Sequence, residues 1–324
     1  MLALLLASML TLVELNCENL FDTIDNPLKA DEEFLPEGSH QWTRTRYWRK
    51  LEQLAKELVA LGGNDRGEWQ LPDLVALCEV ESDTVMHDLT RRSLLRSAGY
   101  DYVMTHSPDA RGINVALVYS PMMFRPIQCR DIRIPRRPQW RPTRDVLYVK
   151  GVYGLDDTLH VFVVHAPSRT GGERATRPYR VLVAQQIGAL ADSILSACSG
   201  AQILVAGDFN DYAHTPALDT LASHKLTDVA GTATGRHGAR GTYRYRGDWG
   251  SLDHILCSPQ MAGRLHECYI GDLPFLMEED TKYGGVKPFR TFLGPTYHRG
   301  YSDHLPLVAR FRTKEDTPAE TDRQ

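Results

Sequence analysis

The stretch ILVAGDFND (203–211) joins an apolar run of strand length to a cluster of polar residues. The aliphatic and β-branched run ILVAG predicts a buried strand, and Gly207 lets the backbone turn tightly after it. Asp208 and Asn210 are two residues apart, so their side chains point the same way if the chain stays extended. One can then serve as a base or metal ligand and the other as an amide donor. An Asx turn also suits DFND well.

Seven further apolar runs along the chain have strand length. They are TLVEL (11–15), DLVALC (73–78), NVALVY (114–119), DVLYVKGVY (145–153), LHVFVV (159–164), LDHILC (252–257) and LPLVARF (305–311). Helical spacing of apolar residues predicts a helix over 48–59 that stops at Gly62-Gly63, and one over 179–195 opened by Pro178. A third helix is expected around 83–97. Helices are too few for a regular βαβ alternation, so a mixed α/β fold is expected.

We expect one domain over residues 11–312, because no linker divides this part of the chain. Residues 1–10 form an apolar N-terminal segment, and the polar residues 313–324 are expected to be a disordered tail. The first thirteen residues resemble a signal-peptide core, but no Lys or Arg precedes them. A weak or truncated export signal and an added length of strand or helix remain equal alternatives, so both a cytoplasmic and an exported location stay open. The apolar stretch is too short for a stable membrane span.

Polar side chains follow four of the predicted strands at the point where each strand ends. They are Asn16, Glu79, His165 and Asp208. One such residue is ordinary turn chemistry, but four can converge at one rim of a sheet, where ligand sites of α/β folds commonly lie. Glu79 supplies a hard oxygen ligand of the kind that Mg²⁺ accepts, although a lone glutamate is more often a surface residue that opens a loop.

A second cluster lies near the C-terminal end of the chain. Asp303 and His304, in YSDHLPL (301–307), can put a carboxylate on a metal and an imidazole on a reacting group. Asp253, which begins the strand of SLDHIL, can accept a proton from a histidine ring and raise its basicity, whereas His254 alternates to the other face and is expected to be structural. Consecutive Ser302, Asp303 and His304 cannot form a serine-hydrolase triad. Each of these short strings alone is also compatible with a polar turn.

The bulk composition limits the function classes. The chain has 324 residues, is 42% hydrophobic and carries a net charge of −4, which gives no global attraction for nucleic acid or an anionic membrane. Binding of an anionic group must therefore be local. Six scattered cysteines with no C-x-x-C pair give no zinc-site spacing.

Asn16, Glu79, His165, the GDFN string, Asp253 in LDHIL and the SDHLP string occur in the order seen in the endonuclease/exonuclease/phosphatase superfamily. The chain resembles that superfamily from about residue 11 to 312. Any one motif is weak, but six in order are specific. The resemblance implies a DNase-I-like, four-layer α/β/β/α sandwich: two packed mixed sheets with outer helices.

The resemblance also implies roles for single residues. Glu79 looks like the main Mg²⁺ ligand, with Asn16 beside it and Asp303 helping; Mn²⁺ is the alternative ion. Asp208 resembles the residue that deprotonates or orients the attacking water, and Asn210 the one that steadies the pentacoordinate phosphorus. His165 and His304 look like the imidazole pair, Asp145 and Asp253 like the carboxylates that orient them, and Arg111 like a phosphate contact. Apart from the resemblance, Arg169 belongs to a group of arginines after His165 that can also bind substrate.

Two departures from the family pattern bear on the substrate. The abasic-site endonuclease branch usually has a tyrosine where His165 stands, so the histidine favours the DNase, sphingomyelinase or inositol-phosphatase side. Glu18 stands where some relatives carry a second acidic ligand. Neither feature changes the phosphoester hydrolysis that the resemblance implies.

A basic strip gives a local feature that bears on the substrate. Residues 125–150 hold seven arginines and Lys150 against two aspartates, and Trp140 lies among them. Such a strip can follow a nucleic-acid backbone with the indole stacked on a base, and a solvated, proline-rich loop is the equal alternative.

The sequence alone leaves three alternative functions. The first is a phosphodiesterase or endonuclease acting on nucleic acid, and the second is a hydrolase of a small phosphoester such as an inositol phosphate or phospholipid head group. The third is a catalytically silent binding module of the same fold. We expect a monomer.

Overall fold

The computed structural model describes residues 9–63, 69–138, 140–154 and 156–313, and it contains two six-stranded mixed sheets packed face to face. The first sheet has the order β13 (Leu265–Ile270), β18 (Leu307–Arg312), β1 (Met9–Leu20), β2 (Leu74–Val80), β4 (Asn114–Tyr119) and β3 (Asp101–Met104). The second has the order β5 (Phe124–Ile132), β6 (Val146–Tyr153), β7 (Asp157–His165), β8 (Gln202–Asp208), β12 (Asp253–Cys257) and β9 (Thr227–Asp228).

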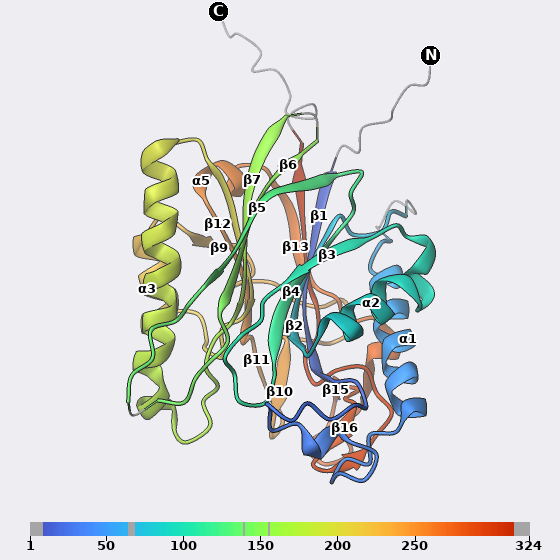
Figure 1. Cartoon of the computed structure of the whole chain (residues 1–324). Coiled ribbons are helices and arrows are strands. Elements are labelled where there is room, and N and C mark those ends of the chain that lie inside the picture. Colours follow the sequence, from blue (N-terminus) through green and yellow to red (C-terminus); the bar gives the residue numbers. More distant parts are fainter. Residues whose placement is uncertain (1–8, 64–68, 139, 155, 314–324) are drawn as a thin grey trace, which may run out of the picture.

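Helices cover the two outer faces of this sandwich, as Figure 1 shows. The first sheet is covered by α1 (Arg44–Ala60) and α2 (Asp83–Arg91), and the second by α3 (Glu173–Ala197) and α4 (Pro216–Ser223). A short helix, α5 (Pro259–Ala262), follows β12. The expected four-layer α/β sandwich of two packed mixed sheets is confirmed.

Small two-stranded ribbons decorate one end of the sandwich (Figure 1). They are β10 (Tyr243–Tyr245) with β11 (Asp248–Gly250), β14 (Met277–Glu279) with β15 (Val286–Pro288), and β16 (Phe292–Leu293) with β17 (Thr296–Tyr297).

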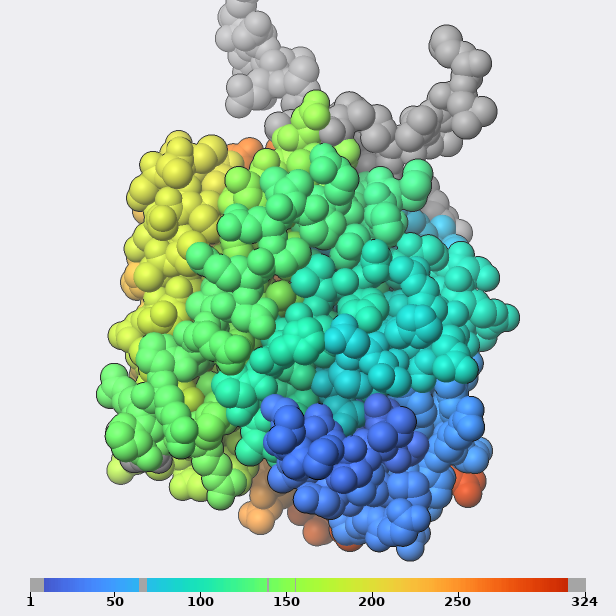
Figure 2. Space-filling view, viewed as in Figure 1, coloured from blue at the N-terminus to red at the C-terminus, as the bar shows by residue number. Residues whose placement is uncertain are grey.

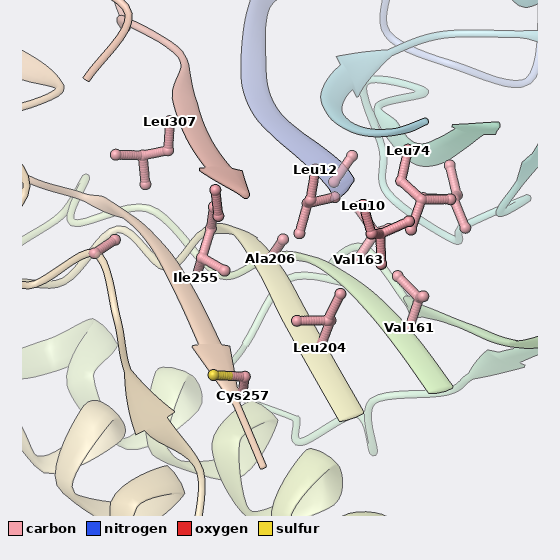
Figure 3. Packing of buried hydrophobic residues seen from close by; sticks show 14 of the residues in the cluster. Leu10, Leu12, Leu74, Val161, Val163, Leu204, Ala206, Ile255, Cys257 and Leu307 are labelled. Atoms are coloured by element: carbon pink, nitrogen blue, oxygen red, sulfur yellow. The ribbon is translucent and has the colours of Figure 1, made fainter. Parts of the chain in front are cut away.

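The main core lies between the two sheets, where aliphatic side chains from both interdigitate (Figure 3). Alternation along each strand assigns the faces: Leu10 and Leu12 of β1 point into this central core, whereas Val13 and Leu15 point outward under the helices. Each fully buried leucine contributes about 1.5–3 kcal/mol relative to an exposed one. Both faces of the strands are buried, which explains their continuous apolar runs.

The same alternation positions the polar strand ends. In β7 and β8, Val161, Val163, Leu204 and Ala206 face the central core, so the next inward positions are His165 and Asp208. Gly207 sits where the two strands approach closely, because a Cβ there would lie 1.9 Å from the Val164 carbonyl oxygen.

The structure changes several expected boundaries. All eight predicted strands form, but β1 runs from Met9 past Asn16 to Leu20, with an irregular register between Asn16 and Leu20. The helix expected from Pro178 begins at Glu173, so Pro178 lies inside α3. The helix expected around 83–97 is divided into α2 and a 3₁₀ turn, Leu94–Ser97.

Some expectations concern parts of the chain outside the described residues. These are most of the N-terminal segment, residues 1–8, and nearly all of the expected disordered tail, residues 314–324. Among the residues that are described, no helix is both long enough and apolar enough to cross a membrane.

Candidate active site

Strand pairing brings three of the expected site residues to neighbouring positions at one rim of the second sheet. Asp208 pairs with His165 across the parallel β7–β8 ladder and with Asp253 across the antiparallel β8–β12 ladder. All three side chains are at inward positions and are almost fully buried. Residues far apart in the sequence thus meet beneath this rim.

His304 completes a compact group with two of these carboxylates. Its Nδ1 lies 2.7 Å from Asp253 Oδ2, and ligand atoms of Asp208, Asp253 and His304 all lie within 4.8 Å of one another. Thr242 also donates its hydroxyl to Asp253 Oδ2. Burial by itself would lower the pKa of His304, but the Asp253 carboxylate outweighs it, and the pKa is raised well above its usual value. His304 is therefore a cation held against Asp253.

Asp208 is held by its own turn and by the opposite sheet. Its Oδ1 accepts the backbone N–H of Asn210 at 2.7 Å, and its Oδ2 accepts Asn16 Nδ2 at 3.1 Å. Burial, followed by the neighbouring Asp253 carboxylate, raises the pKa of Asp208 to about 7.

The extended geometry expected for Asp208 and Asn210 is wrong. Asn210 has a left-handed backbone, with φ of 50°, and the segment forms the alternative Asx turn. The Asn210 side chain still returns to the rim, where its amide donates to the Ala166 carbonyl oxygen at 3.1 Å.

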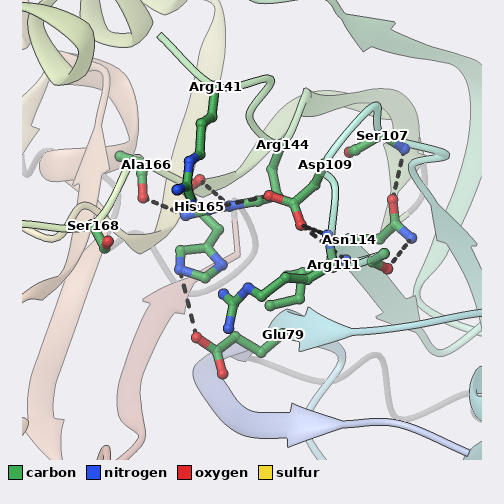
Figure 4. A network of polar contacts seen from close by, with 12 residues as sticks. Glu79, Ser107, Asp109, Arg111, Asn114, Arg141, Arg144, His165, Ala166 and Ser168 are labelled. Atoms are coloured by element: carbon green, nitrogen blue, oxygen red, sulfur yellow. Dashed lines mark hydrogen bonds and ion pairs between the residues drawn. The ribbon is translucent and has the colours of Figure 1, made fainter. Parts of the chain in front are cut away.

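His165 lies between two acidic groups. Its Nε2 is 3.7 Å from Glu79 Oε1 (Figure 4). The same nitrogen is 3.6 Å from Asp208 Oδ2. Burial, aided by the cations of Arg144 and Arg111, lowers the pKa of His165 well below its usual value, so the ring is neutral. Arg144 fixes the backbone here, because its Nε donates to the His165 carbonyl oxygen at 3.2 Å.

The orienting role expected for Asp145 is not supported by its position. The Asp145 carboxylate pairs with Arg133 at 3.0 Å, and His165 Nδ1 is buried without a hydrogen-bond partner among the described residues. Asp145 directly precedes β6, and His165 is the last residue of β7. The Asp145 carboxylate, however, forms its ion pair with Arg133.

Glu79 occupies a strained and partly open position at the end of β2. Its φ is 62°, in the left-handed region, which side chains other than glycine adopt rarely. One carboxylate oxygen accepts the Asn19 backbone N–H at 2.8 Å, while the other faces His165. The side chain is 15% exposed, so the strain turns a carboxylate toward the open rim.

Two acidic sets could hold a divalent ion, and Glu79 fits Mg²⁺ better. In the compact group, His304 Nδ1 and Asp253 Oδ2 lie 2.7 Å apart and bind each other, so a metal ion there would have to displace this contact. Mg²⁺ prefers oxygen ligands and keeps several waters, which requires room at its site. Glu79 offers an oxygen at the partly exposed rim, with the Asn16 side chain one strand away, where Asn16 pairs with Cys78.

Asp303 is engaged by a residue that the sequence analysis missed. Arg290 donates from Nη2 to Asp303 Oδ2 at 2.8 Å, and its Nε lies 3.6 Å from Glu18 Oε1. Glu18 itself accepts the backbone N–H groups of Thr291 and Phe292. Glu18 therefore anchors the 290–292 segment, and Asp303 would reach a metal only in competition with Arg290. Arg290 stands in no recognisable motif, so only its contacts identify it.

A second missed residue is Glu14, which lies on the inner face of β1. It is fully buried, and both its carboxylate oxygens are without hydrogen-bond partners in the described part of the chain. Burial, then the Asp253 and Asp208 carboxylates, raises the pKa of Glu14 well above its usual value. Its place in the run TLVEL gave a signal: an acidic residue at a core-facing position.

The expected phosphate-binding arginines differ in their surroundings. Arg111 is exposed and lies beside Glu79 and His165 in Figure 4, and its charge acts on His165. Arg169 is partly engaged, 3.7 Å from Glu173 and 4.7 Å from the centre of the Tyr212 ring. Trp140, for which stacking on a base was one of two equal alternatives, stacks on Tyr179 with ring centres 4.4 Å apart.

A family model described as the endonuclease/exonuclease/phosphatase family matches residues 11–313. None of the curated proteins matches the chain.

Several solved structures have the same fold. The endonuclease/exonuclease/phosphatase from Bacteroides vulgatus is 16% identical with a TM-score of 0.61, over 94% of this chain and 99% of that one. The mannosyl-6-phosphatase of Bacteroides thetaiotaomicron VPI-5482 is 15% identical with a TM-score of 0.56, over 93% and 98%. The human Nocturnin catalytic domain is 18% identical with a TM-score of 0.54, over 94% of each chain. At these identities the likeness shows the fold alone.

Proposed function

The chain belongs to the endonuclease/exonuclease/phosphatase family, and from that premise we propose that it is a Mg²⁺-dependent phosphoester hydrolase. The observation that carries this proposal is the meeting of two sets of residues where the rims of the two sheets adjoin. Glu79, His165 and Asp208 are linked by contacts of 3.6–3.7 Å, Asp253 and His304 by one of 2.7 Å, and ligand atoms of Asp208, Asp253 and His304 lie within 4.8 Å of one another. A set of acids, an anchored imidazolium and a neutral imidazole suits in-line attack of water on phosphorus.

Each group has a distinct task in this proposal. Asp208 orients the attacking water and takes its proton, while His304, kept cationic by Asp253, donates a hydrogen bond to a phosphoryl oxygen. Asn210 donates with the amide hydrogen that Ala166 does not use. Mg²⁺, held by Glu79 with Asn16 and Asp303, would supply Lewis-acid stabilisation of the phosphoryl charge.

Nucleic acid is the leading substrate class, which makes the enzyme a phosphodiesterase or endonuclease. The support is the basic strip, in which Arg125, Arg130, Arg136, Arg137 and Arg141 are exposed. The part of the chain that carries these arginines is coloured green in Figure 2 and covers much of the visible face. Phosphate neutralisation by such arginines is the main source of affinity for a nucleic-acid backbone.

A small phosphoester is the second candidate substrate. It is favoured because two residues of the basic strip are engaged in contacts within the protein. Arg133 pairs with Asp145, and Trp140 packs on Tyr179, so both are used within the protein. The net charge of −4 gives no further attraction for a polyanion.

Hydrolysis of plasmid DNA, RNA, bis-p-nitrophenyl phosphate and a panel of inositol and sugar phosphates, with Mg²⁺ or with EDTA, tests the proposal. We expect diester cleavage with Mg²⁺ that EDTA abolishes, and collapse of turnover in Asp208→Asn and His165→Ala. Phosphate release from the small compounds with inert DNA would select the second candidate. If the folded wild-type protein hydrolyses none of these compounds, the third alternative, a catalytically silent binding module, is supported.

A further inference from the structure

The ribbon formed by β10 and β11 begins directly beside the proposed catalytic histidine. Tyr243 forms an isolated β-bridge with His304, and the two rings lie with centres 5.0 Å apart. Figure 1 shows the ribbon at the end of the sandwich opposite the two chain termini. Side chains on this ribbon are therefore placed to meet whatever part of a substrate extends beyond the phosphate.

One face of the ribbon is fixed to the protein, and the other carries tyrosines. Arg244 lies between Tyr243 and Tyr245, so its side chain points to the opposite face. There its guanidinium donates to the carbonyl oxygens of Gly284 and Val286. Tyr243 and Tyr245 consequently share the remaining face. The hydrogen bonds of Arg244 hold the ribbon, and with it that face, in position.

Tyr212 lies on the same face as these two tyrosines. Gly250 pairs with Tyr243 across the ribbon, and residues directly opposite each other in an antiparallel pair point to one face. A Cβ on Gly250 would lie 2.6 Å from Cε1 of the Tyr212 ring, so that ring fills the space on this face. Tyr212 also follows the site residue Asn210 by two positions. We call Tyr212, Tyr243 and Tyr245 the tyrosine face.

The outer rings of the tyrosine face are exposed and interleaved with cations. Tyr212 is 40% exposed and Tyr245 is 56% exposed. The Arg169 guanidinium lies over one face of the Tyr212 ring, 4.7 Å from its centre, and that of Arg246 lies over one face of the Tyr245 ring, 5.1 Å from its centre. Alternating aromatic rings and guanidinium groups match a chain that alternates flat bases with phosphates.

We propose that the tyrosine face stacks the unpaired bases of a single-stranded nucleic acid next to the phosphodiester in the active site. This inference rests on the proposed function, because it assigns the substrate class of that same site. Base pairs in a duplex keep their flat faces stacked on each other, so only unpaired bases can use these rings. The arginines that lie over one face of each exposed ring contact the flanking phosphates.

Fluorescence anisotropy with labelled oligonucleotides tests the stacking directly. The probes are an oligodeoxythymidine of about 20 nucleotides, a duplex of the same length, and an abasic strand with the same number of phosphates. Binding is measured in EDTA so that no strand is cleaved. We expect the wild-type protein to bind the oligodeoxythymidine more tightly than the abasic strand and the duplex.

Variants separate stacking from charge and from folding. Tyr245→Ala and Tyr212→Ala should each weaken binding of the oligodeoxythymidine by roughly 5- to 100-fold and leave binding of the abasic strand unchanged. Tyr245→Phe keeps the ring and should bind like the wild type. Trp69→Ala removes another exposed aromatic side chain, 57% exposed and before the start of β2, and should also bind like the wild type.

A kinetic ratio separates this inference from the proposed function. The kcat/KM for the oligodeoxythymidine divided by that for bis-p-nitrophenyl phosphate should fall in both alanine variants, whereas a general loss of structure lowers both constants together. Hydrolysis of bis-p-nitrophenyl phosphate without preference for the oligodeoxythymidine over the abasic strand would overturn the stacking and keep the hydrolase. Ring-dependent binding without any hydrolysis would keep the stacking and overturn the hydrolase.

Discussion

Asp253 and His254 are neighbours in β12, and each makes a buried carboxylate–imidazole pair on an opposite face of the sheet. Asp253 holds His304 at 2.7 Å on the inner face, and His254 binds Asp228 at 2.8 Å on the outer face. His254 also lies 3.0 Å from the Asp211 carbonyl oxygen. The two pairs have the same chemistry, but only the first adjoins Asp208.

Asp253→Asn tests whether the inner pair serves catalysis. A neutral amide cannot hold His304 as a cation, so we expect kcat for bis-p-nitrophenyl phosphate to fall by roughly 10²- to 10⁴-fold. The matched control is Asp228→Asn, which removes the same charge from the outer pair and should keep most of the activity. An equal loss in both variants, with native circular dichroism, would remove the catalytic role from Asp253.

The sequence predicts residues whose place is set by strand register, and it fails for residues placed by loops. Asn16, His165, Asp208 and Asp253 were identified because alternation and strand ends fix their direction. Arg290 was missed because its contact with Asp303 depends on how the 286–301 segment folds back. Asp145 was assigned to His165, but its carboxylate forms an ion pair with Arg133 from the loop between β5 and β6, and no local pattern encodes that pairing.

At the scale of single elements, α1 carries two charged residues into the interior. Lys50 is fully buried and donates to the Thr291 hydroxyl at 2.6 Å and to the Tyr301 carbonyl oxygen. The helix thereby anchors the segment that carries Arg290. Glu57, two turns further on, is buried as well, and burial raises its pKa to about 8.

The buried carboxyl of Glu57 should make the stability fall as pH rises. The folded protein keeps the proton up to about pH 8, whereas the unfolded chain releases it near 4.5, so the unfolded state binds fewer protons between these values. We expect Glu57 to lower the free energy of unfolding by up to about 1.4 kcal/mol per pH unit in this window.

Urea denaturation of Glu57→Gln across that pH window measures the effect. The neutral amide should flatten the decline and stabilise the protein most near the upper end of the window. Glu52→Gln, on the same helix but only half-buried, is the matched control. If the wild type and Glu57→Gln lose stability in parallel as pH rises, the carboxyl is ionised in the folded protein.

The sequence predicts the long buried strands well, but it predicts the start of α3 and the edge strand β5 poorly. The eight long strands were predicted because both their faces are apolar. The start of α3 was misjudged, because Pro178 resembled a first-turn proline, whereas the helix begins after Gly171 and Gly172, both with positive φ. Strand β5 was missed because most of its residues are exposed at the sheet edge, without apolar alternation.

At the scale of the molecule, the two sheets depend on one shared core. The inner faces of β1, β2 and β4 pack on those of β6, β7 and β8, so neither sheet buries its inner face alone. We therefore expect residues 11–312 to unfold as one unit. Tryptophan fluorescence and far-ultraviolet circular dichroism should give one coincident urea transition, independent of protein concentration as expected for a monomer. Two separated transitions would show that the sheets fold independently.

In the proposed enzyme, Glu79 holds a divalent ion for the hydrolytic group around Asp208 and His304. The most direct test is the Mg²⁺ dependence of bis-p-nitrophenyl phosphate hydrolysis by the wild type, Glu79→Gln and the control Glu81→Gln, whose carboxylate instead accepts the Asp22 backbone N–H. We predict no turnover in EDTA, recovery with Mg²⁺, and a Mg²⁺ requirement at least about tenfold higher in Glu79→Gln alone. Turnover that persists in EDTA, or identical Mg²⁺ curves for the wild type and Glu79→Gln, would contradict the claim.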